Sequence, residues 1–261
     1  MQKNIYIRNM YYLRNVSMSK RYNLYMGLIM VCALFVMVFS FILSDKQIEQ
    51  SVSKRVLEEK VCYLTFDDGP SNNSKDILDI LAKYDAKATF FLIGSQTSEE
   101  NKTIIERIVE EGHAIGLHSN VHDFDKLYIG ADACVQDFEE QYKNLKEEYG
   151  IDTKIFRFPG GSACSYMNGQ RQSYINAMRE KGFIGFDWHV SGEDSYGNPT
   201  VWSIQKNVFD NLKDYTNPII LLHDINIADA TVDALPGILE QIIKEGYSFG
   251  TLDNSAEYIY R

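Results

Sequence analysis

The sequence lacks several features that would place it in a common class of protein. Its four cysteines form no CxxC pair, which argues against a zinc ribbon or a redox dithiol. Basic residues are the minority, 26 against 36 acidic ones, so we expect no nucleic-acid partner. No serine stands in a GxSxG motif, and no internal repeat or low-complexity stretch occurs. What is present is a globular composition, 45% hydrophobic and 24% charged, in 261 residues, enough for one catalytic domain and an appendage.

Acidic residues are also absent from positions 1–44, where the basic residues are Lys3, Arg8, Arg14, Lys20 and Arg21. Within this region, residues 24–43 (LYMGLIMVCALFVMVFSFIL) carry no charge. Twenty helical residues rise about 30 Å, which is the thickness of a bilayer's hydrocarbon core. We therefore predict one transmembrane helix at 24–43. A cleaved signal peptide is the alternative, although FILSD is not a small-x-small cleavage site.

The position of the basic residues predicts the orientation of this helix. Because they precede the span and Asp45 follows it, residues 1–23 are expected in the cytoplasm. Residues 44–60 are then a linker, and residues 61–261 form a domain outside the cell. The predicted location is the cell membrane, with the lipid bilayer as one partner.

From Val61 onward, segments typical of strands and of helices alternate. We expect strands in VCYLTF, ATFFLIG, AIGLH, IFRF, GFIGFDW, PIILLH and YSFG. Helices are expected at about 74–84, 100–112, 131–149, 171–181, 201–214 and 230–245. This alternation predicts an α/β fold in which helices cover a parallel sheet. About seven such units in one domain favour a closed or nearly closed barrel.

Two adjacent carboxylates end the first expected strand. The motif LTFDDGP places Asp67 and Asp68 at its carboxyl end, which is the active-site face of a β/α barrel. Adjacent carboxylates repel each other, so they coexist best when a cation engages at least one of them. An Asp-rich turn that caps a helix is the alternative interpretation of this motif alone.

Two histidines follow a later strand at a spacing of four residues. His118 ends the strand AIGL, and His122 completes HSNVH. Two imidazoles one helical turn apart can share a metal, and with a carboxylate they form a site with open positions. Surface histidines can have the same spacing, but the strand-terminal carboxylates favour metal ligation here.

Three further motifs place distinctive side chains at strand ends. FRFPGGS contains Arg157, which can hold a neighbouring carboxylate ionised and oriented. FDWHVSGED brings Asp187 and Trp188 to a strand end, where Trp188 suits the core or a substrate-facing wall equally well. IILLHD places His223 at the end of a buried strand, where it is suited to general-acid work near neutral pH.

These five motifs, in this order, resemble those of the polysaccharide deacetylases that share the NodB homology domain, carbohydrate esterase family 4. The resemblance extends from about Val61 to Gly250 and rests above all on TFDDGP and HSxxH. It implies a distorted (β/α) barrel that removes acetyl groups from N-acetylated, and sometimes O-acetylated, sugars. It also implies a divalent metal, with zinc expected and Co²⁺, Mn²⁺ or Ni²⁺ as alternatives.

The resemblance further implies roles for the strand-end residues. Asp67 is expected to be the catalytic base and His223 the catalytic acid. Asp68, His118 and His122 are expected to bind the metal.

Other roles follow from the same resemblance. Arg157 resembles the residue that tunes the base, and Asp187 resembles the partner of the acid. Leu221 and Trp188 resemble walls of the pocket for the acetyl methyl group. Gly160 departs from the family pattern, because the third motif usually carries an aromatic residue there. Its N–H is expected to bind the oxyanion, but the ring that would border the sugar groove is lost.

The predicted substrate depends on the predicted location. An anchor that faces outward favours a polysaccharide of the cell wall, above all the N-acetylglucosamine of peptidoglycan, with acetate and a free amino sugar as products. Chitin oligomers, acetylxylan and an exopolysaccharide such as poly-N-acetylglucosamine are alternatives. An inactive carbohydrate-binding module on the same fold would be expected to lack the base, a ligand or the acid, and this chain lacks none.

Overall fold

The computed structural model describes residues 30, 34, 37–41 and 60–253. The chain divides into two compact units, Met1–Glu59 and Lys60–Arg261. The described residues of the first unit are helical and exposed. Within the described part of the chain, no helix has both the length and the apolar character needed to cross a membrane.

Several predictions therefore concern residues that are not described. The predicted cytoplasmic segment at 1–23 lies outside the described residues. Most of the predicted span at 24–43, and the linker at 44–60 apart from Lys60, lie outside them as well.

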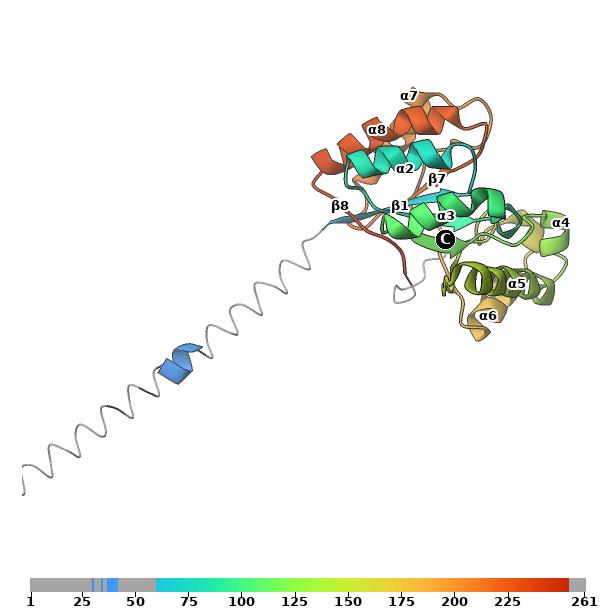
Figure 1. The fold of residues 1–261 in the computed structure, drawn as a ribbon, viewed down its shortest axis with the longest axis horizontal. Coiled ribbons are helices and arrows are strands. Elements are labelled where there is room, and N and C mark those ends of the chain that lie inside the picture. Colours follow the sequence, from blue (N-terminus) through green and yellow to red (C-terminus); the bar gives the residue numbers. More distant parts are fainter. Residues whose placement is uncertain (1–29, 31–33, 35–36, 42–59, 254–261) are drawn as a thin grey trace, which may run out of the picture. The chain divides into compact units, whose positions relative to one another are not determined.

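The second unit is built on a sheet in which all eight strands pair in parallel (Figure 1). Seven strands follow the order β5-β4-β3-β2-β1-β7-β6, and β8 pairs with the start of β1. The predicted parallel β/α architecture is confirmed, and the strand pairing of the described residues leaves the barrel open between β5 and β6. The strands are β1 (Val61–Asp67), β2 (Ala88–Leu92), β3 (Ala114–Leu117), β4 (Ile155–Phe156), β5 (Ile184–Gly185), β6 (Val190–Ser191), β7 (Ile219–His223) and β8 (Ser248–Phe249).

Helices alternate with these strands, as predicted. In Figure 1, α2, α7 and α8 lie together on one part of the sheet, and α5 packs beside α6. The short elements β6 and α4 were not predicted, because two to four residues give no periodicity. The α-helices are α2 (Ser74–Lys83), α3 (Lys102–Glu110), α4 (Phe124–Leu127), α5 (Ala131–Tyr149), α6 (Arg171–Glu180), α7 (Val201–Leu212) and α8 (Asp229–Lys244), and 3₁₀ turns are η1 (Gly94–Gln96), η2 (Glu99–Asn101) and η3 (Ser165–Met167).

Apolar side chains cover both faces of the central strands. All five residues of β2 are buried, as expected for a parallel strand that is covered on both sides. Neighbouring residues of a strand point to opposite faces, so Phe90 packs in the large core beneath the helices and Phe91 in a separate cluster. This separate cluster contains Phe91, Ile155, Phe186, Ile219 and Leu252. The Arg157 guanidinium lies 4.3 Å from the centre of the Phe91 ring, so this cluster supports the site described next.

Candidate active site

The predicted catalytic residues lie at the carboxyl ends of neighbouring strands. Asp67 is the last residue of β1, His223 is the last residue of β7, and the two are paired in register. His118 directly follows β3. Because all of these strands run in parallel, their carboxyl ends meet at one edge of the sheet, and residues distant in the sequence come together there.

Asp68, His118 and His122 form a group that could hold a metal ion. Their candidate ligand atoms all lie within 4.8 Å of one another. The Asp68 Oδ1 atom is 3.3 Å from His118 Nε2 and 3.2 Å from His122 Nε2. This oxygen is buried and has no hydrogen-bond partner, although two ring nitrogens face it. A cation between the three groups would satisfy all of them, so the donor set fits a divalent metal.

The charge of Asp68 fits the same interpretation. Burial raises the pKa of this carboxyl, but the facing imidazoles of His118 and His122 outweigh burial and lower the pKa well below its usual range. Asp68 is therefore ionised at neutral pH, which is the form that binds a cation.

The backbone fixes the orientation of these ligands. His118 Nδ1 donates to the Arg157 carbonyl at 2.9 Å, and this bond orients the ring so that Nε2 faces Asp68. Asp68, Ser119 and His122 have positive φ angles of 73°, 71° and 53°. Residues other than glycine rarely adopt this region, and each costs about 1–3 kcal/mol there. Such strain is typical of functional sites, where the surrounding fold compensates for it.

Arg157 holds the predicted base in a fixed position. Its Nη1 group donates to Asp67 Oδ1 at 2.7 Å and to Thr65 Oγ1 at 2.8 Å. The guanidinium is fully buried and also donates to the carbonyls of Phe186 and Asp187, at 2.9 and 3.1 Å. A charged group with this many bonds cannot reorient without leaving a buried donor unpaired, so Asp67 is rigidly placed.

The partner of His223 is Asp194, and the prediction of Asp187 for this position is corrected. His223 Nδ1 lies 2.8 Å from Asp194 Oδ1, and the His223 backbone N–H donates to Asp194 Oδ2 at 2.8 Å. Thr231 Oγ1 donates to the same Oδ2 atom at 2.8 Å. Burial lowers the pKa of His223, but the hydrogen bond and charge of Asp194 outweigh burial and raise it above its ordinary value.

Asp187 has a different position. It accepts hydrogen bonds from the Ser162 N–H at 2.9 Å and from Ser162 Oγ at 2.6 Å. Asp187 therefore fixes the turn that contains Gly160, because the two segments are joined by these bonds. The signal that was missed is VSGED: β6 lies beside β7, so a carboxylate just after β6 comes close to His223.

A second buried carboxylate supports the loop of Asp67 and Asp68. Asp224 accepts hydrogen bonds from the hydroxyls of Ser71 and Ser74, each at 2.5 Å, and its N–H donates to the Asp67 carbonyl at 2.8 Å. A Cβ atom on Gly69 would lie 2.5 Å from Asp224 Oδ2, so only glycine fits this close approach. The turn after β1 is thereby attached to the end of β7.

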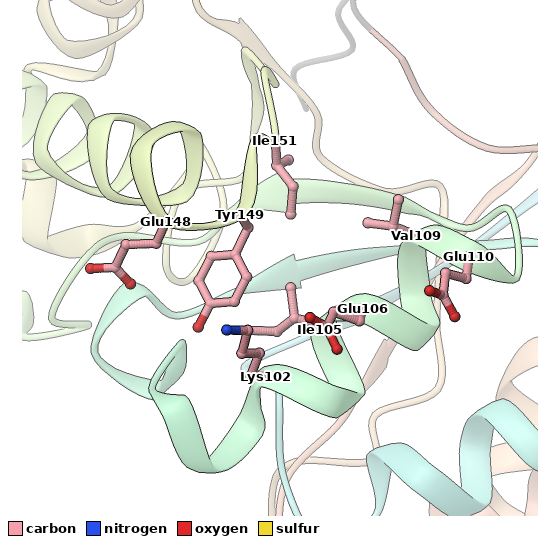
Figure 2. A pocket seen from close by; sticks show the side chains of 8 residues that line it. All are labelled: Lys102, Ile105, Glu106, Val109, Glu110, Glu148, Tyr149 and Ile151. Carbon is pink, nitrogen blue, oxygen red and sulfur yellow. The ribbon is translucent and has the colours of Figure 1, made fainter.

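The predicted residues other than Arg157 and Asp187 line one cavity of about 230 Å³. The predicted substrate-contacting residues Gly160, Trp188 and Leu221 all line it, whereas Phe124 and Ser195 line it without having been predicted. Another pocket, drawn in Figure 2, lies between α3 and the end of α5 and contains none of the predicted residues. The full lining of the first cavity is Asp67, Asp68, His118, His122, Phe124, Gly160, Trp188, Ser195, Leu221 and His223.

Comparison with known proteins shows the family to which this chain is related. The polysaccharide deacetylase family model matches residues 54–183. A peptidoglycan-N-acetylglucosamine deacetylase of Bacillus cereus is 37% identical over 196 residues, which are 74% of this chain and 69% of that protein. A bifunctional xylanase/deacetylase of Pseudobutyrivibrio xylanivorans is 34% identical over 199 residues, 76% of this chain but 31% of that protein.

A solved structure also matches the fold. The catalytic domain of a peptidoglycan N-acetylglucosamine deacetylase from Eubacterium rectale superposes with a TM-score of 0.70 at 31% sequence identity. The match covers 77% of this chain and 93% of that domain. The chain belongs to the polysaccharide deacetylase family, carbohydrate esterase family 4. It is a hydrolytic deacetylase. The comparisons thus confirm the deacetylase activity that was predicted from the five motifs.

Proposed function

We propose that this enzyme uses a divalent metal, zinc in the native protein, to remove N-acetyl groups from the N-acetylglucosamine residues of peptidoglycan. The observation that carries the proposal is the complete constellation around one cavity. It contains a carboxylate held by a buried arginine, a ligand set with an unpaired buried oxygen, and a histidine paired with an aspartate.

Asp67 is the proposed base. Arg157 holds one of its carboxylate oxygens, which leaves Oδ2 to accept a proton from the attacking water. Oδ2 also lies 3.7 Å from His118 Nε2, at the edge of the proposed metal site. Asp67 and Asp68 thus have separate tasks, because one is held by Arg157 and the other by two imidazoles.

His223 is the proposed acid. Asp194 stabilises the protonated imidazole and binds Nδ1, so Nε2 is the atom that donates a proton to the departing nitrogen. The Gly160 N–H is the proposed donor to the oxyanion, and Leu221 and Trp188 enclose the acetyl methyl group. A metal held by Asp68, His118 and His122 would supply Lewis acidity at the acetyl carbonyl and lower the pKa of water.

The choice of peptidoglycan is supported by relatives and by the N-terminal sequence. Related proteins from Bacillus cereus and Eubacterium rectale are named as peptidoglycan N-acetylglucosamine deacetylases. We further propose that residues 24–43 anchor the enzyme in the membrane with residues 61–261 outside, where newly made peptidoglycan is the nearest polymer. Membrane fractionation and a protease added outside intact cells test this location. A soluble, shortened form in the medium would instead indicate a cleaved signal peptide.

The substrate proposal is tested with the purified full chain loaded with zinc. Isolated peptidoglycan, chitin oligomers and acetylxylan are incubated in parallel, and released acetate and new free amines are measured. We expect acetate together with glucosamine amines from peptidoglycan. Rapid release from acetylxylan or chitin oligomers, with none from any peptidoglycan preparation, would overturn the choice of substrate and leave the deacetylase activity standing.

A further inference from the structure

Gly160 has no aromatic side chain, but the ring of Phe124, from another part of the chain, lies beside it. Gly160 has a φ angle of +74°, and a Cβ atom built on it would lie 3.3 Å from Phe124 Cε1 and 3.2 Å from Cys164 Sγ. A side chain at 160 would therefore press against both Phe124 and Cys164, in addition to the strain of the positive φ angle. Gly160 leaves room for the Phe124 ring. Phe124 therefore occupies the side of the cavity where the sequence analysis expected a missing aromatic ring.

Phe124 is held beside the proposed metal site. It is the first residue of α4, whose N-cap residue Asp123 accepts a hydrogen bond from the Lys126 N–H at 3.2 Å. The Phe124 ring lies edge-on to the ring of His122, with centroids 5.4 Å apart and planes at 81°. It lines the same cavity as Gly160. The ring is thus fixed at the cavity wall, two residues after a ligand.

Tyr166 extends this aromatic surface toward solvent. Its ring centroid is 5.1 Å from that of Phe124, with the planes at 59°. Tyr166 lies in η3, next to Met167, which is buried and fixes this turn in the core. The Tyr166 residue itself is 48% exposed. An exposed aromatic ring in contact with a cavity ring offers apolar surface just outside the site of the reaction.

We infer that Phe124 and Tyr166 form an aromatic wall that binds the sugar residue next to the one that is deacetylated. The inference rests on the proposed function and adds a specificity-determining surface to it. A pyranose ring presents C–H groups with partial positive charge on its faces, and these pack against the negative face of an aromatic ring. A glycan that reaches the wall gains binding energy that a single acetylated sugar cannot gain, and this energy can orient the acetamide.

The test compares long and short substrates on the full zinc-loaded chain. The probes are N-acetylglucosamine oligomers of two and six residues and 4-nitrophenyl acetate, whose acetyl group needs no neighbouring sugar. For Tyr166→Ala, we expect the ratio of kcat/KM on the hexamer to kcat/KM on the aryl ester to fall about tenfold, mainly through KM. Tyr166→Phe keeps the ring and should keep the ratio.

Two further variants separate the aromatic wall from general damage. Phe124→Leu retains bulk against Gly160 but removes the ring, so it should lower the same ratio. Because loss of metal would reduce both activities together, the ratio does not respond to it. Trp202→Ala is the control, since Trp202 is 70% exposed on α7 and does not line the cavity.

The possible outcomes distinguish the two proposals. If Tyr166→Ala and Phe124→Leu keep the wild-type ratio while the wild type deacetylates the hexamer, the aromatic wall is wrong and the proposed function stands. If the zinc-loaded wild type releases acetate from the aryl ester but from no glycan, the proposed function fails. A ratio that falls in Tyr166→Ala and Phe124→Leu, but not in Tyr166→Phe or Trp202→Ala, supports the aromatic wall.

Discussion

His113 and His118 stand at opposite ends of the same strand, β3, and both are buried. His113 Nδ1 accepts a hydrogen bond from the Ala88 N–H at 3.2 Å, and burial lowers the pKa of this histidine to about 4. His118 instead donates from Nδ1 to the Arg157 carbonyl and directs Nε2 toward Asp68. The same residue type is therefore a neutral structural group at one end and a candidate metal ligand at the other.

The difference follows from the direction of the strands. At the carboxyl edge of the sheet, the last residues of β1 and β7 place Asp67 and His223 side by side, and the turn after β1 adds Asp68. At the amino edge, His113 lies 3.9 Å from Glu111, but desolvation dominates its ionisation. Burial, reinforced by the charges of Lys87 and Arg107, thus keeps His113 neutral, whereas burial beside several carboxylates prepares a site for a cation.

Among changes at the carboxyl edge, substitution of the proposed base Asp67 should have the largest effect on activity. Asp67→Asn keeps the shape of the side chain but cannot accept a proton, so we expect kcat to fall about 1000-fold while the metal remains bound. Asp68→Asn should instead weaken metal binding itself. Turnover and metal content are measured for both variants. Equal metal content and equal rates in the two would contradict the separate roles of the adjacent carboxylates.

The two ends of β3 can be compared directly by metal analysis. His118→Ala should remove most of the bound zinc after dialysis, because it deletes one of the three proposed ligands. His113→Asn is the matched variant, since the asparagine oxygen can still accept from the Ala88 N–H, and it should retain about one zinc per chain. Stoichiometric zinc in a variant that lacks both His118 and His122 would disprove the ligand set.

The buried His113 at the amino edge should make the stability of the protein depend on pH in the acid range. The pKa of His113 is lowered from 6.5 to about 4 in the folded protein. Below pH 6.5 the unfolded chain therefore binds a proton that the folded chain does not, and stability falls until pH reaches about 4. The full contribution is about 3 kcal/mol in the free energy of unfolding.

Urea titrations at pH 7 and pH 4.5 measure this effect. In His113→Asn the difference in unfolding free energy between the two pH values should be smaller than in the wild type. His189→Asn serves as a control for loss of a histidine elsewhere in the chain. An equally steep acid dependence in His113→Asn and the wild type would show that other groups cause it.

The sequence predicted most of the fold because long elements carry a strong periodic signal. Helices such as α5 and α8 and buried strands such as β1 and β7 were located to within a few residues. The short strand β6 was not, since its two residues are defined by pairing with β7 rather than by their own pattern. Whether the barrel closes between β5 and β6 likewise could not be predicted, because it depends on long-range strand pairing that no local motif encodes.

The same distinction applies to the site. Asp67, Asp68, His118 and His223 stand at or just after strand ends, so the strand pattern was sufficient to bring them together. His122 was found instead from its spacing of four residues after His118. Asp194 was missed because it follows the unpredicted strand β6. The family resemblance assigned this role to Asp187, and residue type and strand-end position do not decide between two carboxylates of FDWHVSGED that are seven residues apart.

The correction of Asp187 to Asp194 can be tested by the pH dependence of kcat. His223 must be protonated to act as the acid, so activity is lost as pH rises through the pKa of His223. Asp194 raises that pKa through its hydrogen bond and charge, against the opposing effect of burial. Asp194→Asn removes the charge, so the alkaline limb of the profile should move to lower pH, and kcat at the optimum should fall about tenfold.

Asp187→Asn is the matched control. It weakens the bonds to Ser162 and can lower the rate through the Gly160 turn, but it should leave the alkaline limb in place. If Asp187→Asn moves that limb and Asp194→Asn does not, the prediction of Asp187 as partner of the acid was right. The pairing of His223 with Asp194 then does not determine the pKa of His223.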